Sequence, residues 1–515
     1  MNEQLALLPG YLTAHLQLTL VALLLGIAIS VPLGVFVTRL RWIEQPIMGG
    51  ASIIQTIPSL ALLAIMVPTL AALKLQSIGY LPAVIGLTLY SILPILRNTV
   101  AGLESVDPAL LEAARGVGMT PAQQLRRVEL PVAMPVIVAG IRTSTVWTVG
   151  IATLATPVGA TSLGNYIFTG LQTRNFAAVM VGCVAASILA LLLDGLVRAL
   201  EVAIQRHNRT LAVTALGVFG LLCLFAGAST AHDFWSPSRP RIVIGAKTFT
   251  EQYILSEILA QTIQQTTGLG TTIKQSLGST VAFDALRSGN LDAYVDYSGT
   301  IWATIMKRDR VPDDRTEVLR TVARYLADEH GIEQVGALGF ENAYALAMRD
   351  RQATDLGISR ISDLTAHARD LSIGGDYEFF GRPEWRDLRN AYDLKFKSRR
   401  SMDSSLMYQA VANGNVDVIS AFSTDGRIAA LHLRVLEDGR GAIPPYDAII
   451  LVSPYLARRH PGVVKALHRL VGMIDVDRMR KMNRAVDEFG RTPAEVAAEF
   501  LREKTLVPSS GLRSN

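Results

Sequence analysis

Long apolar segments in the first 230 residues constrain the fold more than any other feature of the sequence. A helix needs about 20 apolar residues to cross a bilayer. Prolines within two of the segments are typical of helices whose neighbours satisfy the freed carbonyls, which indicates a packed bundle rather than a lone anchor. We predict membrane-spanning helices at residues 12–37, 50–73, 81–103, 131–154, 176–198 and 210–230.

Charged residues are scarce in this apolar part and ordinary in the rest of the 515 residues. Residues 1–209 contain 12 Lys or Arg and 8 Asp or Glu, whereas residues 210–515 contain 37 and 36. This asymmetry excludes a wholly soluble enzyme, a disordered chain and a collagen-like fibre. The net charge of +5 is small for this length and no long basic run occurs, so we predict no nucleic-acid partner.

Basic residues between the apolar segments predict the orientation in the membrane. Under the positive-inside rule, the loops rich in arginine face the cytoplasm. The N-terminus then lies outside, and the sixth segment returns the chain to the outer side. We therefore predict a multi-pass protein of the cytoplasmic (inner) membrane, in contact with its lipids. The loop arginines are Arg39, Arg41, Arg97, Arg115, Arg126, Arg127, Arg198, Arg206 and Arg209.

Three other residues of the apolar part have chemistry of interest. Cys183 and Cys223 lie within apolar runs, so we predict neither a disulfide nor a metal site. Asp194 lies four residues before Arg198 in the fifth segment. We expect Asp194 and Arg198 to form an ion pair near the helix end. A buried proton relay through Asp194 is the alternative.

Residues 231–240 are predicted to be a linker, and an α/β domain follows. The run at 242–245 is predicted as a buried strand, and residues 251–268 as a helix that ends at Gly268. Further strands, at YVDYSG, AYALAM, LSIGG, VDVIS and AIILV, alternate with helical stretches. The strings ALRSGNLDAYVDY and AVANGNVDVISAF have the same helix, turn and strand pattern. They indicate two related lobes, with coincidence as the alternative.

The segment from Glu112 to Pro131 has a distinctive spacing. Glu112-Ala113-Ala114 is followed by three residues, Gly118, nine residues, Val128, one residue and Leu-Pro. This resembles the coupling loop by which ABC-transporter permeases dock onto their ATPase, with Val128 where the family usually has isoleucine. We expect a short helix that starts at Glu112 and breaks at Gly118. The alternative is that the segment is only an amphipathic cytoplasmic connector. The four predicted coupling residues are Glu112, Ala113, Ala114 and Gly118.

No Walker A sequence occurs in the chain. The resemblance therefore implies that a separate ATPase subunit binds ATP, that the chain itself holds no cofactor or metal, and that the permease forms a homodimer. The part from residue 241 onward lacks a nucleophile and base arrangement, so we do not expect an enzyme.

Residues 241–515 resemble the substrate-binding proteins of importers for glycine betaine, choline, carnitine or ergothioneine. The resemblance rests on IVIGAKTFTEQYIL, LGSTVAFDALRSGNLDAYVDYSGT, NAYALAM, MDSSLMYQAVANGNVDVISAFSTDGRI and PPYDAI, and residues 1–209 resemble the matching permease. Those ligands share a trimethylammonium group, which donates no hydrogen bond and is held by aromatic faces. The aromatic candidates are Tyr297, Tyr377, Tyr344, Phe379, Phe380, Tyr408, Phe422 and Tyr446, each with core packing as its alternative; Tyr253 we expect in the core.

Polar candidates lie beside these aromatic residues. Thr280 precedes a helix and either faces a ligand carboxylate or caps the helix, and Thr250 is a possible helix cap. Asp296 either faces the cation or braces its loop. Asp425 is a candidate for the cation, and Arg427 either binds a carboxylate or braces the lobe.

The sequence thus predicts an all-α transmembrane bundle of the ABC permease type, followed by a two-lobed α/β domain of the periplasmic-binding-protein type. By the resemblance, residues 1–209 form the permease with the coupling loop at 112–131, and 210–230 form an additional span. Lobe I comprises 241–345 and 443–510, and lobe II comprises 346–442. The predicted function is ATP-driven import of a quaternary-ammonium compound, and the alternative is a membrane-anchored receptor that signals without transport.

Overall fold

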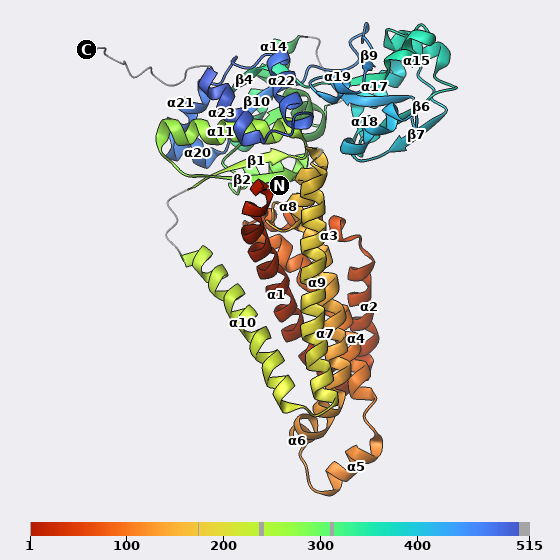
Figure 1. Ribbon diagram of the computed structural model, residues 1–515, viewed down its shortest axis with the longest axis vertical. Coiled ribbons are helices and arrows are strands. Elements are labelled where there is room, and N and C mark those ends of the chain that lie inside the picture. The colour runs from red at the N-terminus through yellow and green to blue at the C-terminus, as the bar shows by residue number, and fades with distance from the viewer. Residues whose placement is uncertain (1, 174, 236–240, 309–313, 504–515) are drawn as a thin grey trace, which may run out of the picture. The chain divides into compact units, whose positions relative to one another are not determined.

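The computed structural model describes residues 2–173, 175–235, 241–308 and 314–503 (Figure 1). They form two compact units, one with helices α1–α10 except for residues 169–176, and one with those residues and all ten strands. Residues 231–235 of the predicted linker belong to α10, and the rest of that linker lies outside the described residues.

The first unit is entirely helical. Five of its helical stretches are long and apolar enough to span a membrane, and they coincide with five of the six predicted spans. Its elements are α1 (Asn2–Arg39), α2 (Arg41–Thr56), α3 (Ser59–Ala72), α4 (Tyr80–Glu104), α5 (Pro108–Gly116), α6 (Pro121–Gln124), the π-helical turn η1 (Leu125–Glu129), α7 (Leu130–Ala152), the 3-10 turn η2 (Thr153–Val158), α8 (Gly164–Gln172), α9 (Phe176–Gln205) and α10 (Arg209–Trp235).

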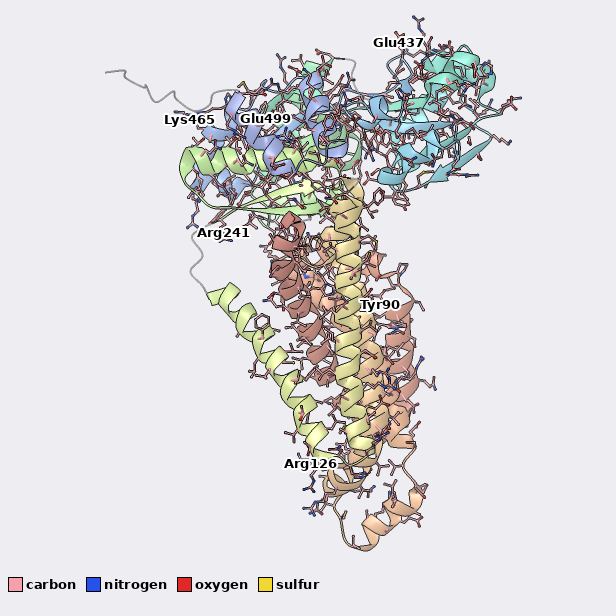
Figure 2. All side chains as sticks on the ribbon, in the orientation of Figure 1. Tyr90, Arg126, Arg241, Glu437, Lys465 and Glu499 are labelled. Atoms are coloured by element: carbon pink, nitrogen blue, oxygen red, sulfur yellow. The ribbon has the colours of Figure 1, made fainter. Side chains whose placement is uncertain are left out.

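The remaining predicted span, residues 50–73, is not one helix. It is divided between α2 and α3, which meet at an angle of 100°. Ile57 is extended, with φ of −68° and ψ of 128°, and Pro58 precedes the first residue of α3. Proline disfavours helical geometry in the residue before it, which explains the break. The Tyr90 hydroxyl of α4 donates a hydrogen bond to the Ile57 carbonyl freed there. Tyr90 is labelled in Figure 2.

Helix α4 packs against both α1 and α7 in the core of the bundle. Small residues make this close approach possible. A Cβ atom on Gly26 of α1 would lie 1.9 Å from the Ser91 hydroxyl, and one on Gly140 of α7 would lie 2.8 Å from the Pro94 carbonyl. Membrane helices use glycine in this way to bring backbones into contact.

An ion pair links α7 and α9 within the bundle. Arg142 donates from Nε to Asp194 Oδ1 at 2.6 Å and from Nη2 to Oδ2 at 3.1 Å. The predicted partner Arg198 is therefore replaced by Arg142, which reaches the carboxylate with the paired geometry that suits guanidinium. Cys183 and Cys223 are both free thiols.

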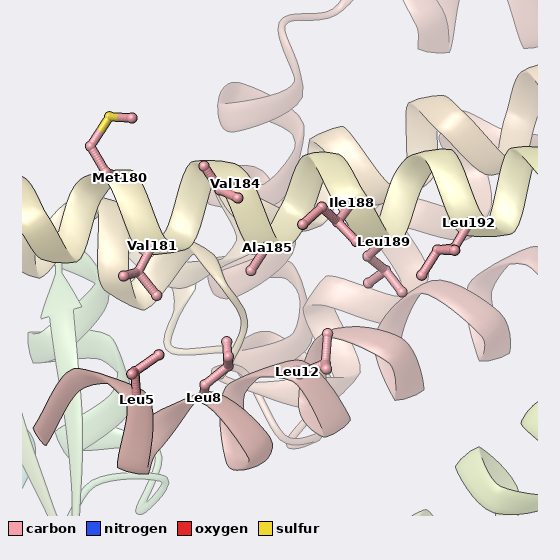
Figure 3. A pocket seen from close by; sticks show the side chains of 10 residues that line it. All are labelled: Leu5, Leu8, Leu12, Met180, Val181, Val184, Ala185, Ile188, Leu189 and Leu192. Carbon is pink, nitrogen blue, oxygen red and sulfur yellow. The ribbon is translucent and has the colours of Figure 1, made fainter. Parts of the chain in front are cut away.

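A groove of about 460 Å³ runs between α1 and α9 (Figure 3). Only apolar side chains line it, which is typical of a surface in contact with hydrocarbon. The lining residues are Leu5, Leu8, Leu12, Met180, Val181, Val184, Ala185, Ile188, Leu189 and Leu192.

The second unit has two five-stranded sheets with helices around them. The strands are β1 (Ile242–Lys247), β2 (Thr271–Leu277), β3 (Ala293–Tyr297), β4 (Glu333–Glu341), β5 (Tyr344–Arg349), β6 (Ser372–Gly375), β7 (Ser398–Ser401), β8 (Val418–Phe422), β9 (Leu433–Val435) and β10 (Asp447–Val452). The helices are α11 (Thr250–Thr267), α12 (Ser279–Arg287), α13 (Ser298–Thr300), α14 (Arg315–His330), α15 (Asp350–Asp355), α16 (Leu364–His367), α17 (Pro383–Tyr392), α18 (Ser404–Ala412), α19 (Arg427–Ala430), α20 (Pro454–Arg459), α21 (Pro461–His468), α22 (Val476–Asp487) and α23 (Pro493–Glu503). The short turns are η3 (Ile301–Ile305), η4 (Ile361–Asp363) and η5 (Phe379–Gly381).

The two sheets share one topology. Their strand orders are β2-β1-β3-β10-β4 and β7-β6-β8-β5-β9, and in each sheet the fourth strand runs antiparallel to its neighbours. We call the part around the first sheet lobe I and the part around the second lobe II. The chain crosses between the lobes at residues 342–343 and again between β9 and β10. Tyr344 and Ala345 therefore lie in the sheet of lobe II, just before the predicted boundary.

The two repeated strings occupy equivalent places in the two lobes. In each, a helix is followed by a glycine with positive φ, Gly289 at 75° and Gly414 at 77°. An aspartate then accepts a hydrogen bond from the neighbouring strand's backbone: Asp292 from Val243 N–H and Asp417 from Ser372 N–H, both at 2.8 Å. This equivalence favours the interpretation of two related lobes over coincidence.

Candidate ligand-binding site

A cluster of aromatic rings lies where the two lobes meet. Phe249, just before α11 in lobe I, stacks on Phe422 at the end of β8 in lobe II, with centroids 5.9 Å apart and planes at 8°. Phe249 also stacks on Tyr297 at 6.1 Å. Tyr344 contacts Phe422 at 5.3 Å and Phe379 at 5.1 Å. The structure thus brings together four predicted residues, Tyr297, Tyr344, Phe379 and Phe422, with Phe249 as the link.

Of the remaining predicted aromatic residues, Tyr446 lies at the same junction, 6.1 Å from Tyr344, whereas Tyr408 and Tyr377 have different surroundings. Tyr408 is fully buried in the core of lobe II, where its hydroxyl accepts a hydrogen bond from the Phe422 N–H at 2.9 Å. Tyr377 is 73% exposed and has no ring contact among the described residues. Tyr253 is in the core of lobe I, as expected.

Glu251 connects the two lobes through its side chain. This carboxylate of α11 is fully buried and accepts from the Tyr297 hydroxyl at 2.5 Å and from Asn342 Nδ2 at 3.0 Å. It also accepts from the Thr424 hydroxyl of lobe II and from Asn483 of α22. Burial raises the pKa of Glu251, and these hydrogen bonds lower it in part. A polar group without such donors would be costly at this depth.

Asp296 has a bracing role at the end of β3, and neither of its oxygens is left to face a cation. The Lys247 ammonium donates to its Oδ1 at 2.6 Å, and the Tyr294 hydroxyl donates to Oδ2 at the same distance. Lys247 also lies 4.9 Å from the Tyr297 ring centroid. Both carboxylate oxygens of Asp296 are therefore already bound, which favours the bracing alternative for this residue.

Asp425 and Arg427 form an ion pair with each other. Arg427 donates from Nε to Asp425 Oδ1 at 2.9 Å and from Nη2 to Oδ2 at 2.5 Å. Both side chains are buried, and the guanidinium lies 4.0 Å from the Tyr408 ring centroid. A buried, paired and stacked arginine is typical of a structural brace. The geometry favours bracing for Arg427 and leaves Asp425 without a free charge for a cation.

The two threonine predictions meet different outcomes. Gly278, not Thr280, precedes the first residue of α12, so Thr280 lies in the first turn with an exposed side chain and does not cap the helix. Phe249, not Thr250, occupies the cap position of α11. The Thr250 hydroxyl instead donates to Asp487 at 2.7 Å. The expectation of a Thr250 cap was wrong because α11 begins one residue earlier than predicted.

Lobe II contributes two charged groups beside the rings. Arg382 is buried and donates to Glu378 at 2.9 Å and to Glu384 at 3.3 Å, with its guanidinium 5.4 Å from the Tyr344 ring. Asp376 follows the end of β6 and is only 8% exposed. Its Oδ1 accepts from the N–H groups of Glu378 and Phe379, at 2.8 and 2.9 Å.

Four residues of this site were not predicted from the sequence: Phe249, Glu251, Asp376 and Arg382. Phe249 and Glu251 both lie within the string IVIGAKTFTEQYIL, between the end of β1 and the first turn of α11. Asp376 adjoins the predicted Tyr377. Ligands in α/β folds bind beyond the carboxyl ends of strands, and that rule was a usable signal for Phe249 and Asp376. Arg382 carried no signal of this kind.

The segment of residues 107–131 has well-defined local geometry in the first unit. Helix α5 begins at Pro108, capped by Asp107, so Glu112 lies within the helix and does not start it as expected. The helix ends as predicted, with Gly118 at φ of +80°. The Gly118 and Met119 N–H groups donate to the Arg115 and Ala114 carbonyls, the Schellman pattern that favours glycine.

Side chains of this segment differ in exposure. Glu112 and Ala113 are exposed, whereas Ala114 is buried. Thr120 and Gln123 form a reciprocal capping box at the start of α6. Arg126 lies beyond it in η1 with an exposed side chain (Figure 2). The segment therefore presents a structured surface with both charged and small residues.

Comparison with known proteins identifies both units. Residues 30–206 match the family model described as binding-protein-dependent transport system inner membrane component. Residues 240–503 match the substrate binding domain of ABC-type glycine betaine transport system. The ergothioneine transport permease/ergothioneine binding protein EgtU of Helicobacter pylori is 30% identical over 492 residues, which cover 93% of this chain and 87% of that protein.

The chain belongs to the family of ABC-importer permeases fused to their own substrate-binding domain. Two further relatives each match part of it. The choline transport system permease protein OpuBB of Bacillus subtilis is 48% identical over 35% of this chain and 80% of its own length. A glycine-betaine-binding protein of Pseudomonas aeruginosa is 36% identical over 59% of this chain and 96% of its own length.

Family membership confirms the predicted fold class and the role as a permease with a fused substrate-binding domain. It favours an importer over the alternative of a receptor that signals without transport. The chain is accordingly a membrane protein that carries a domain for a small ligand, and the importer family implies an ATPase partner.

Proposed function

We propose that the importer takes up a small quaternary-ammonium solute, with glycine betaine, choline, carnitine and ergothioneine as the candidates. The observation that carries this proposal is the aromatic cluster formed by Phe249, Tyr297, Tyr344, Phe379 and Phe422 at the lobe junction. The printed names of the relatives support the same solute class, since they include transporters or binding proteins for all four compounds.

The chemistry of the trimethylammonium group explains why rings are needed. Its charge is spread over methyl groups that donate no conventional hydrogen bond, so recognition depends on contact and on cation–π attraction. Each ring contributes about 0.5–2 kcal/mol, depending on how far the site is desolvated. Rings from both lobes would therefore favour the arrangement in which the lobes are closed on the solute.

We propose that a separate ATPase subunit docks on residues 107–131 and supplies the energy for transport. ATP would bind to that subunit, and this chain would hold no cofactor of its own. The exposed Glu112 and Ala113 of α5 and the turn at Gly118 give the docking surface, and the buried Ala114 packs beneath it. A rigid helix and turn can transmit a rigid-body movement into the bundle. Two copies of the permease would complete the importer.

We propose that the arginine-rich loops face the cytoplasm and that the substrate-binding domain lies on the outer side of the cytoplasmic (inner) membrane. The positive-inside rule supports this orientation, because arginines cluster in alternate loops. The wholly apolar groove between α1 and α9 would then lie against lipid acyl chains. Fusion to the permease keeps the binding domain at a high effective concentration near the pore.

Calorimetry on the purified full chain tests the solute class. Glycine betaine, choline, carnitine and ergothioneine would be titrated separately, with L-proline as a solute that lacks the trimethylammonium group. Binding of at least one of the four at micromolar or lower Kd, with no heat from L-proline, is the expected result. Absence of binding by all four in a folded preparation would refute the proposed solute class and leave the family assignment intact.

A further inference from the structure

The carboxylates around the aromatic cluster are mostly neutralised by the protein itself. Asp296 is paired with Lys247. Asp425 is paired with Arg427. Glu384 is paired with Arg382 and accepts a hydrogen bond from the Tyr446 hydroxyl. Glu251 accepts hydrogen bonds from four side chains. The first three are paired with cations and both oxygens of Glu251 are occupied by hydrogen bonds, so none of the four has an oxygen left for a bound cation.

Asp376 differs from these carboxylates. Its Oδ1 is occupied by two backbone N–H groups, but its Oδ2 is buried and has no hydrogen-bond partner of normal geometry among the described residues. No lysine, arginine or histidine within ion-pair distance of Asp376 is found in the described part of the chain. The nearby Arg382 is matched by Glu378 and Glu384. A buried carboxylate oxygen without a partner is costly, so it calls for an explanation.

Asp376 lies beside the rings of the proposed solute site. It follows the end of β6, where a Cβ atom on Gly375 would lie 2.9 Å from both the Phe379 and Phe380 rings. The neutral Tyr344 side chain is a hydrogen-bonding neighbour of the Asp376 carboxyl and lowers its pKa. Tyr344 in turn contacts Phe379 and Phe422. A partly compensated carboxylate therefore adjoins the aromatic cluster.

We propose that Asp376 supplies the negative charge that faces the solute's trimethylammonium group and makes the site select cations over neutral solutes of the same shape. This inference rests on the proposed function. The rings alone attract a cation weakly and also accept a neutral tert-butyl group by contact. A carboxylate in low-dielectric surroundings adds an attraction that only the cation receives.

The buried position of Asp376 fits this role. Burial raises the pKa of the Asp376 carboxyl, while its backbone hydrogen bonds and the Tyr344 side chain lower it. A bound cation would favour the ionised form further, because an opposite charge nearby stabilises the carboxylate. The backbone hydrogen bonds to Oδ1 fix the side chain, so Oδ2 is held in place before the solute arrives.

The test compares a charged solute with its neutral carbon isostere on the full chain. Choline pairs with 3,3-dimethylbutan-1-ol, which has the same shape and no charge. Asp376→Asn keeps an oxygen for the two backbone N–H groups and removes the charge. We expect Asp376→Asn to weaken binding of the cationic member by about tenfold or more and to change binding of the isostere by less than about twofold. Asp370→Asn, an exposed residue of the same lobe, is the control for net charge.

Each outcome decides between the claims. Unchanged cation affinity in Asp376→Asn, with wild-type binding intact, would overturn the role of Asp376 and leave the proposed function standing. An equal loss for cation and isostere, or a matching fall in unfolding temperature, would assign Asp376 a structural role and also overturn the inference. If the wild-type chain binds none of the four candidate solutes, the proposed function itself fails, and this inference fails with it.

Discussion

Glu251 connects the two lobes directly through its side chain. Its carboxylate accepts hydrogen bonds from Tyr297 of lobe I, Asn342 of the connecting segment, Thr424 of lobe II and Asn483 of α22. Replacing a fully buried, multiply bonded carboxylate leaves several donors unsatisfied, each at a cost of about 1–3 kcal/mol. Glu251 therefore sets the geometry in which the rings of the two lobes meet.

The pH dependence of stability should report on Glu251. Burial raises the pKa of this carboxyl in the folded chain, so folding favours its protonated form. This contribution to stability is full below the ordinary glutamate pKa of about 4.3 and is lost as the pH rises through the folded value. Glu251→Gln does not titrate, so its unfolding temperature, measured by scanning fluorimetry on the full chain, should fall less with rising pH.

The exposed Glu333 provides the matched control, because Glu333→Gln should leave the pH dependence of the wild-type chain unchanged. Each unit by which folding raises the pKa corresponds to about 1.4 kcal/mol, which is large enough to detect. If Glu251→Gln and the wild-type chain lose stability in parallel as the pH rises, the buried proton on Glu251 is ruled out.

At this scale the sequence indicates residues at strand ends but not their partners. Tyr297, Tyr344 and Phe422 end or begin strands, and that position, within strings that resemble the binding-protein family, made them candidates. Whether a carboxylate is paired depends on segments far away in the chain. Asp296 meets Lys247, 49 residues earlier, whereas Asp376 has no cationic partner among the described residues, and no local pattern distinguishes the two.

Among the elements, the long apolar helices were predictable because hydropathy alone determines them. Five of six predicted spans coincide with long apolar helices of the structure. The exception, residues 50–73, contains Pro58 and Pro68, yet only Pro58 coincides with a break. Proline is tolerated inside a membrane helix, so its presence alone does not locate a bend. The Tyr90 hydroxyl, which satisfies the Ile57 carbonyl, became visible only in three dimensions.

In the second unit, strands were likewise predictable from the sequence where they are apolar and buried. The buried strands β1, β3, β5, β6, β8 and β10 were predicted from their apolar runs. Strands β2, β4, β7 and β9 were missed, and β2 and β7 are mixed in polarity and less buried. A half-exposed strand has a weak apolar signal and is recognised mainly by its pairing.

Gly118 is the element-scale test of the proposed ATPase dock. Its φ of +80° is strained for any residue with a side chain, which costs about 1–2 kcal/mol locally. We expect Gly118→Val to reduce solute-stimulated ATP hydrolysis and uptake at least severalfold in the reconstituted importer, with no change in the solute Kd. Gly116→Ala lies in the same helix at an ordinary backbone conformation with open space around it, and should behave as wild type.

A Gly118→Val chain that transports normally would show that the turn after α5 does not couple to the ATPase. A lowered solute affinity in the same variant would point to general damage to the chain and would equally contradict the specific role. Solute binding therefore has to be measured alongside uptake in every variant of this segment.

For the whole molecule, the fusion places solute capture and passage in one chain. The matches to a permease family and a substrate-binding family together cover most of the sequence, and a relative aligns over 93% of it. A tethered binding domain does not have to diffuse to its permease. This arrangement should matter most at low external solute concentration, where capture limits the rate.

The most direct test of the account is ATP-dependent uptake by the complete importer. The full chain, with the ATPase that co-purifies with it, would be placed in proteoliposomes with labelled glycine betaine, choline, carnitine or ergothioneine outside. We predict accumulation of at least one of the four, dependent on ATP and reduced at least tenfold at low solute concentration by Asp376→Asn. Failure of all four to accumulate, in vesicles where the chain and ATPase are intact and hydrolyse ATP, would contradict the central claim.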